Sequence, residues 1–143
     1  MTERTANVTW TGSLLEGSGT IDSVGSGAFG PLDVTWASRA EEPAGRTSPE
    51  ELIAAAHASC LSMALSGGLA KAGSPPDRLE TSATVTFVPG TGITAIALTV
   101  RGSVPGMDEE AFRAAAEAAK EGCPVSKALA SVPEITLDAA LLS

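Results

Sequence analysis

Alternating apolar and polar residues mark the first part of the chain as strand-forming. Three segments alternate in this way and are separated by glycine-rich turns: Asn7–Thr11, Ser18–Ser23 and Leu32–Ala37. A period of two residues is typical of β-strands that place one face on a core. The polar segment Glu41–Arg46 reads as a loop. We therefore expect an N-terminal sheet that ends before this loop.

A long apolar run after the loop predicts a buried helix. Ser48 is a favourable N-cap, Pro49 suits the first helical position, and Glu51 completes an S-x-x-E capping box. From Leu52 to Leu65 the sequence is apolar on nearly every side, and a helix of this kind is normally buried. The glycines and prolines of residues 67–76 are expected to weaken and then end it.

The second half of the chain alternates again and then becomes helical. The expected elements are strands at Leu79–Val88 and Ile93–Val104 with a turn at Pro89–Gly92, a helix from Asp108 to Glu121, a short helix from Pro124 to Ala130, and a strand beginning in Glu134–Leu142. This order predicts an α+β fold with antiparallel sheets around the long helix, in a single domain of residues 1–143. The early strands need a sheet to join and the central helix needs cover on more than one side, which favours an intertwined oligomer.

Composition and charge exclude several classes of partner. The chain is 43% apolar and 18% charged, with a net charge of −8 and a pI near 4.5. No basic patch is available to neutralise phosphates, which argues against nucleic acid and against an anionic membrane surface. The N-terminus does not resemble a signal peptide, and Leu52–Leu65 is too short to span a bilayer. We expect a soluble cytoplasmic protein whose thiols are normally reduced.

Two cysteines carry the candidate chemistry. A free Cys is often simply a small buried apolar residue, and for Cys60 within an Ala-rich helix this is the simplest interpretation. Cys123 directly precedes Pro124 at a helix start, where a thiolate is favoured. Cys60 would need a nearby cation to ionise, because burial raises the pKa of a thiol. From the residues alone Cys123 is therefore the more acidic thiol, and a reactive pair and an inert pair both remain open.

Other thiol chemistries fit the spacing less well. The sequence has no C-x-x-C pair and lacks the four ligands of a structural zinc site. A catalytic zinc site made of Cys60, Cys123 and His57 is a minor alternative. His57 shares a helix face with Cys60 and could act as a base, although a lone buried histidine more often has a structural role.

Two motifs resemble those of a known family. The run TSPEELIAAAHASCLSMALS (Thr47–Ser66) and the later EGCPVSKAL (Glu121–Leu129), with the terminal EITLD, closely resemble the OsmC/Ohr family of osmotically inducible and organic-hydroperoxide-resistance proteins. The AAHA before the first cysteine and the CPVS at the second resemble the OsmC branch. The resemblance covers essentially the whole chain.

The resemblance implies a thiol peroxidase that reduces organic hydroperoxides and, more weakly, hydrogen peroxide. It implies an interwoven homodimer with two active sites at the subunit interface, no metal or other cofactor, and reduction by an external dithiol, for which a lipoyl protein is one candidate. By position, Cys60 would be the peroxidatic cysteine and Cys123 the resolving one, which overrules the ranking by acidity. A redox-sensing or stress-induced binding protein with a reversible cysteine pair is the alternative, and a structural role for inert thiols is a third.

The family also places an arginine beside the peroxidatic sulfur, oriented by a glutamate. Arg39 matches this arginine and Glu50 the glutamate, while Arg46 is a competitor for the arginine position. From residue 50 to residue 60 a helix rises about 15 Å, so Glu50 does not easily reach Cys60 of its own chain. We therefore expect Glu50 to come from the partner subunit and to join Cys60, Cys123 and Arg39 of the other, while the subunit that supplies Arg39 stays open.

Overall fold

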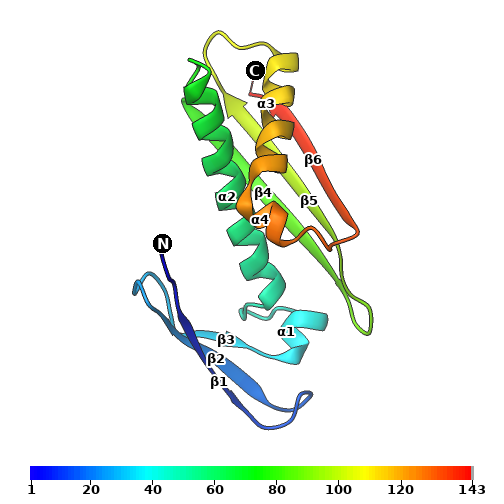
Figure 1. Ribbon diagram of the computed structural model, residues 1–143. Coiled ribbons are helices and arrows are strands. Elements are labelled where there is room, and N and C mark those ends of the chain that lie inside the picture. The colour runs from blue at the N-terminus through cyan, green and yellow to red at the C-terminus, as the bar shows by residue number, and fades with distance from the viewer. Residues whose placement is uncertain (143) are drawn as a thin grey trace. The chain divides into compact units, whose positions relative to one another are not determined.

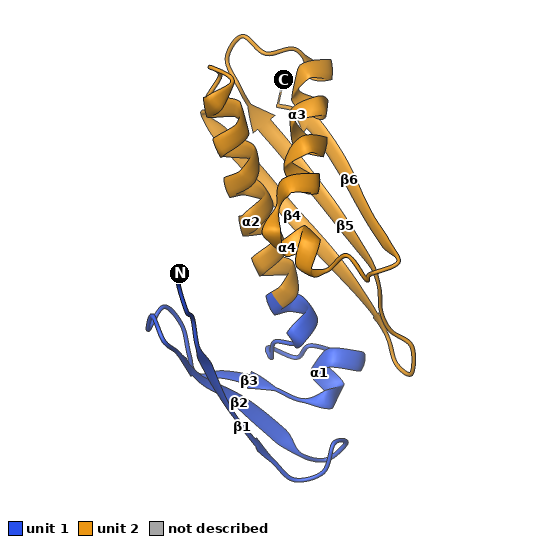
Figure 2. Cartoon of the chain, viewed as in Figure 1, with its two compact units in different colours: residues 1–52 blue, residues 53–143 orange. Residues whose placement is uncertain are grey.

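A computed structural model describes residues 1–142, which divide into two compact units (Figure 1 and Figure 2). The first unit comprises residues 1–52 and the second begins at Ile53. The long helix α2 (Pro49–Lys71) starts in the first unit and continues in the second. Each unit has its own sheet, and the single-domain organisation stays a prediction.

The first unit is a three-stranded antiparallel sheet followed by a short helix. Its elements in chain order are β1 (Ala6–Thr11), β2 (Ser18–Val24), β3 (Leu32–Val34) and α1 (Trp36–Ala40). The three predicted strands are confirmed, but the expectation that the third continues to residue 37 is wrong. Thr35 and Ser38 form a reciprocal capping box, each side chain accepting the other's backbone N–H, at 3.0 and 2.9 Å. This local pairing begins a helix where alternation predicted a strand.

The sheet of the first unit leaves much apolar surface exposed. Every residue of β1 is exposed, including Val8 at 59% and Trp10 at 40%. The Trp10 ring lies over Gly19 of β2, where a Cβ atom would come within 2.6 Å of the ring. Glycine is therefore required at position 19 for this close approach. The unit buries Ile21 but leaves the apolar residues of β1 uncovered.

The second unit is a three-stranded sheet with helices packed against it. Its elements after α2 are β4 (Arg78–Val88), β5 (Gly92–Ser103), α3 (Glu109–Gly122), α4 (Pro124–Ala128) and β6 (Glu134–Leu141). The strand order is β4-β5-β6, with β4 and β5 antiparallel and β5 and β6 parallel. The prediction of purely antiparallel sheets is therefore wrong. The chain passes through α3 and α4 between β5 and β6, and a crossover of this length allows β6 to run parallel to β5.

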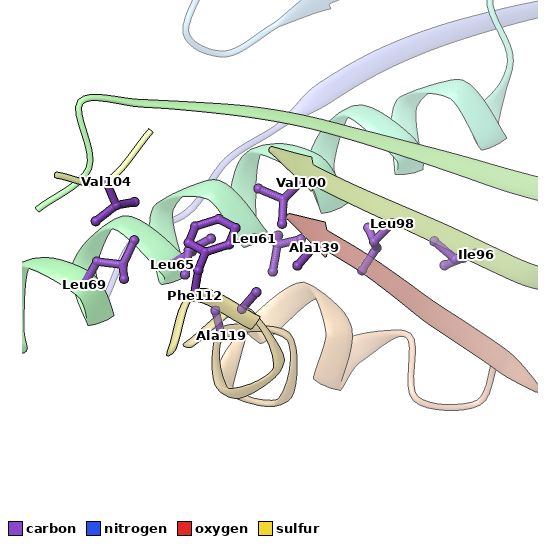
Figure 3. Packing of buried hydrophobic residues seen from close by; sticks show 11 residues of the cluster. Leu61, Leu65, Leu69, Ile96, Leu98, Val100, Val104, Phe112, Ala119 and Ala139 are labelled. Carbon is purple, nitrogen blue, oxygen red and sulfur yellow. The ribbon is translucent and has the colours of Figure 1, made fainter. Parts of the chain in front are cut away.

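The core of the second unit lies between α2, α3 and one face of this sheet (Figure 3). Its most buried members are three leucines of α2, the alternate residues of β5, and Phe112 with two alanines of α3: Leu61, Leu65, Leu69, Ile96, Leu98, Val100, Phe112, Ala116 and Ala119. Phe112 lies against Gly102, where a Cβ atom would come within 2.5 Å of the ring. Glycine at position 102 lets α3 pack closely on β5.

Helix α2 differs from its prediction in length and in burial. Gly67 and Gly68 remain helical, since the buried Leu65 and Leu69 on either side anchor the last turns, and helical glycine costs only about 1 kcal/mol per residue. The helix ends before Gly73, whose φ is +91°. Its buried residues recur every fourth position, whereas Met63 on another side is 75% exposed. The expectation of burial on every side is therefore wrong for the chain by itself.

Helix α2 is longer than predicted and reaches the length of a transmembrane helix. The complete helix α2 has 23 residues, more than the run Leu52–Leu65, and is long and apolar enough to cross a bilayer by length and composition alone. It nevertheless supplies three leucines to the core and holds the fully buried His57. We therefore assign α2 as a core helix.

Candidate active site

The two cysteines meet between α2 and α4 in the second unit. Cys60 lies within α2, and Cys123 is the residue that ends α3 and begins α4. Their Sγ atoms are 2.9 Å apart, and both thiols are free. The backbone N–H of Cys123 donates to Ala119 O at 2.8 Å, which fixes the junction of the two helices. The sequence motifs thus come together as a contacting thiol pair, with Cys123 fully buried.

The surroundings of the two thiols shift their pKa values in opposite directions. Burial raises the pKa of Cys60, and its hydrogen bond to Cys123 raises it further. Burial also acts to raise the pKa of Cys123, but its interactions with the neighbouring Cys60 thiol and with Val125 and Ser126 of α4 outweigh it. The pKa of Cys123 therefore lies below its ordinary value. Within this unit Cys123 is the more acidic thiol, and Cys60 needs a cation to become a thiolate.

His57 lies one helical turn before Cys60, but its partner is not that cysteine. Its Nε2 is 2.8 Å from Ser126 Oγ on α4, and its side chain is fully buried. Burial lowers the pKa of His57, so the imidazole is neutral. Its Nε2 is engaged with a hydroxyl group, which weakens the interpretation of His57 as a zinc ligand. Sequence analysis missed Ser126, although it stands in the CPVS motif one turn after Cys123.

Arg39 and Glu50 form a partly buried ion pair in the first unit. Arg39 Nε lies 2.9 Å and 3.2 Å from the two carboxylate oxygens of Glu50, and a terminal guanidinium nitrogen lies 2.8 Å from Oε1. The side chain of Glu50 is 8% exposed and that of Arg39 is 32% exposed. Such a bidentate pair fixes the plane of the guanidinium group. One edge of this group is held by the carboxylate.

The start of α2 places Glu50 opposite α1. Ser38 Oγ donates to Thr47 O at 2.9 Å, which ties α1 to the residues before α2. Ser48 Oγ accepts from the backbone N–H of Glu51 at 3.2 Å, as the predicted capping box requires. The Glu51 carboxylate, however, accepts from Thr47 Oγ1 at 2.8 Å and does not complete the box. These contacts orient the first turn of α2.

The ion pair revises two expectations. Arg39 and Glu50 of one chain bind each other, so their predicted separation into different subunits is wrong, and whichever subunit supplies one supplies both. Arg46 is exposed in the turn before α2, whereas the guanidinium of Arg39 also lies over the Trp36 ring at 6.0 Å from its centroid. Geometry therefore favours Arg39 over Arg46 as the oriented arginine.

Comparison with known proteins decides the family. A family model described as OsmC-like protein matches residues 42–138. The chain belongs to the OsmC family. It is also 44% identical over 137 residues to Peroxiredoxin OsmC of Escherichia coli, a match that covers 94% of this chain and 93% of the relative. The predicted family and its OsmC branch are confirmed, and the chain is a Cys-based peroxidase of this family.

Solved structures agree with the OsmC fold. An organic hydroperoxide resistance protein OsmC from Legionella pneumophila is similar with a TM-score of 0.72 at 22% identity, covering 95% of this chain and 96% of that one. The organic hydroperoxide resistance protein OhrB of Bacillus subtilis has a TM-score of 0.65 at 25% identity, covering 96% and 98%. The α+β, OsmC-like fold is thereby confirmed. The family match includes Glu50, Cys60 and Cys123 but begins after Arg39, so Arg39 is assigned from its contact with Glu50.

Proposed function

We propose that this OsmC-family peroxidase reduces organic hydroperoxides through Cys60 and that Cys123 then resolves the Cys60 sulfenic acid to a disulfide. The observation that carries the proposal is the 2.9 Å contact between the two free thiols. The name of the Legionella relative, an organic hydroperoxide resistance protein, supports an organic peroxide as the substrate. We infer that hydrogen peroxide is a weaker one.

The cycle has three steps. The Cys60 thiolate attacks the distal peroxide oxygen, the O–O bond breaks, and the alkoxide takes up a proton and leaves as an alcohol. Cys60 becomes a sulfenic acid, which condenses with Cys123 to a disulfide and releases water. An external dithiol, with a lipoyl protein as one candidate, then reduces the disulfide by exchange. Both electrons come from this dithiol, so the cycle needs no further cofactor.

Arg39, which is held by Glu50, supplies the cation that Cys60 lacks. Because burial raises the pKa of Cys60, a guanidinium beside its sulfur is needed to stabilise the thiolate and polarise the peroxide. Glu50 orients Arg39 for this task. A helix rises about 15 Å from residue 50 to residue 60, and we infer that the ion pair of one subunit serves the cysteines of the other.

A homodimer fits the surfaces that the chain leaves uncovered. These include β1 with its exposed Val8 and Trp10, and the side of α2 that carries Met63. Exposed apolar surface of this kind is typical of an interface between subunits. We further infer that the protein acts in the cytoplasm, where reducing conditions would return its cysteines to thiols.

Turnover with an alkyl hydroperoxide and a small dithiol tests the proposed function. Many moles of peroxide consumed per mole of protein are expected. A single stoichiometric oxidation would instead indicate the redox sensor, and no oxidation would indicate structural thiols. Dihydrolipoyl protein and thioredoxin, compared as reductants at equal concentration, then identify the class of electron donor.

Removing Arg39 is expected to raise the pKa of Cys60, because an adjacent cation favours the thiolate. The measurement is the pH dependence of Cys60 alkylation in Arg39→Ala, with Arg46→Ala as the matched control. Arg39→Lys should be intermediate, since lysine keeps the charge but not the bidentate contact with Glu50. A shift confined to the Arg46 variant would mean that Arg46 is the active-site arginine.

A further inference from the structure

Helix α1, which carries Arg39, depends on polar contacts for its place. It has only five residues, and a helix of this length has little stability of its own. The Thr35–Ser38 capping box begins it, and the buried hydroxyl of Ser38 also lies 2.9 Å from Thr47 O. The backbone N–H of Thr47 donates in turn to Asp33 O at 3.0 Å. Helix α1 is therefore tied to the segment that leads into α2.

The guanidinium group of Arg39 is held along one edge and over one face. The Glu50 carboxylate holds the edge, with nitrogen–oxygen distances of 2.8 and 2.9 Å. The face lies over the indole ring of Trp36, with Cζ 6.0 Å from the ring centroid. Trp36 stands three residues before Arg39 on α1, and residues at this spacing share a side of a helix. Among aromatic side chains, tryptophan attracts a cation most strongly.

The two contacts limit different movements of the guanidinium group. A bidentate carboxylate fixes the direction of the nitrogen atoms that it binds, but the group can still tilt about the line that joins it to the carboxylate. A ring against one face restricts this tilt. The restriction matters because the long Arg39 side chain is 32% exposed, and an exposed arginine has many rotamers open to it.

We propose that Trp36 is a positioning residue for the active-site arginine, because its ring sets the tilt of the Arg39 guanidinium that stabilises the Cys60 thiolate and polarises the peroxide. A cation that is already oriented stabilises charge without first having to be ordered. Trp36 thus acts through Arg39 and takes no part in the chemistry itself. The inference rests on the proposed function, since it assumes that Arg39 serves Cys60.

Single-turnover rates for the two chemical steps test this role. After one equivalent of alkyl hydroperoxide, consumption of the peroxide reports Cys60 oxidation, and decay of the trappable sulfenic acid reports disulfide formation. Trp36→Leu is expected to slow Cys60 oxidation about 2- to 10-fold, through loss of a partly exposed cation–π contact. Disulfide formation involves Cys60 and Cys123 but not the arginine, and should stay within about twofold of wild type. Trp36→Phe, which keeps an aromatic face, should retain most of the oxidation rate.

A double-mutant cycle separates positioning from packing. In an Arg39→Ala background, Trp36→Leu should slow Cys60 oxidation no further, because no guanidinium remains to be positioned. Ala37→Ser, at an exposed position of the same helix, is the matched control and should change neither rate. If Trp36→Leu does not fold, Trp36→Met provides a flexible apolar side chain that can fill the same space without an aromatic face, and the same results are expected of it.

The outcomes distinguish this role from the proposed function on which it rests. Cys60 oxidation at the wild-type rate in the folded Leu or Met variant of Trp36, equal slowing of both steps, or the same slowing with and without Arg39 would each overturn the role of Trp36. An Arg39→Ala variant that oxidises Cys60 as fast as wild type would instead show that Arg39 does not serve the cysteine, and the role of Trp36 would fall with it. A wild-type protein whose Cys60 does not react with peroxide would refute the proposed function itself.

Discussion

Cys60→Ser should lower peroxidase turnover by about 10⁴-fold or more, since removal of a covalent nucleophile leaves only residual catalysis. Cys123→Ser should also stop turnover under limiting dithiol, but for another reason. Its Cys60 can still react once with peroxide and then remains a sulfenic acid, because no thiol lies within contact to condense with it. Peroxide consumed per protein, measured together with trapping of the sulfenic acid, separates the two variants.

Ser59→Ala is the matched control, because Ser59 adjoins Cys60 but is exposed and donates only to carbonyl groups of its own helix. It should retain wild-type turnover. The opposite assignment, with Cys123 as the nucleophile, would also have a chemical basis, because Cys123 is the more acidic thiol within the second unit. If Cys60→Ser consumed one equivalent of peroxide and Cys123→Ser consumed none, Cys123 would be the nucleophile and the roles would have to be exchanged.

The parts of the fold that sequence patterns predicted are those governed by local periodicity. Alternation located the strands, and the punctuation around Ser48 and Asp108 located the starts of the two longer helices, with α2 beginning at Pro49 and Asp108 capping α3. The errors arose where tertiary contacts override local preference. Gly67 and Gly68 stay helical because neighbouring leucines are buried, and the direction of β6 depends on a crossover that no local pattern records.

The residues of the candidate site were likewise predicted only in part from the sequence. Motif resemblance identified Cys60 and Cys123, and the structure brings their sulfurs into contact. Arg39 and Arg46 could not be ranked from sequence, because the choice depends on which of them the loop before α2 presents to Glu50. Ser126 carries no signal of its own in the sequence. Its contact with His57 appears only when α4 packs beside α2.

Mixing two inactive variants should restore activity if the active site is shared between subunits. Cys60→Ser lacks the nucleophile, and Glu50→Ala lacks the carboxylate that orients Arg39. In a heterodimer with shared sites, one site carries both defects and the other carries neither. Random reassembly of equal amounts gives heterodimers in about half of the dimers, so activity should return to about a quarter of wild type for a two-fold symmetric assembly. The measurement is peroxide turnover after joint refolding, with heterodimers verified by mass.

The intrachain pairing of Arg39 with Glu50 makes this experiment sharper. Because Arg39 and Glu50 of one chain pair with each other, the same subunit supplies both to a site. Arg39→Ala must therefore behave like Glu50→Ala when it is mixed with Cys60→Ser. Mixing Arg39→Ala with Glu50→Ala provides the matched negative control, since both defects lie in the same ion pair and every site of every dimer stays damaged. Recovery with Cys60→Ser but not between these two variants would assign the ion pair to the partner subunit. Verified heterodimers that stay inactive in every combination would mean that Arg39 and Glu50 serve the cysteines of their own chain, and the shared site would have to be abandoned.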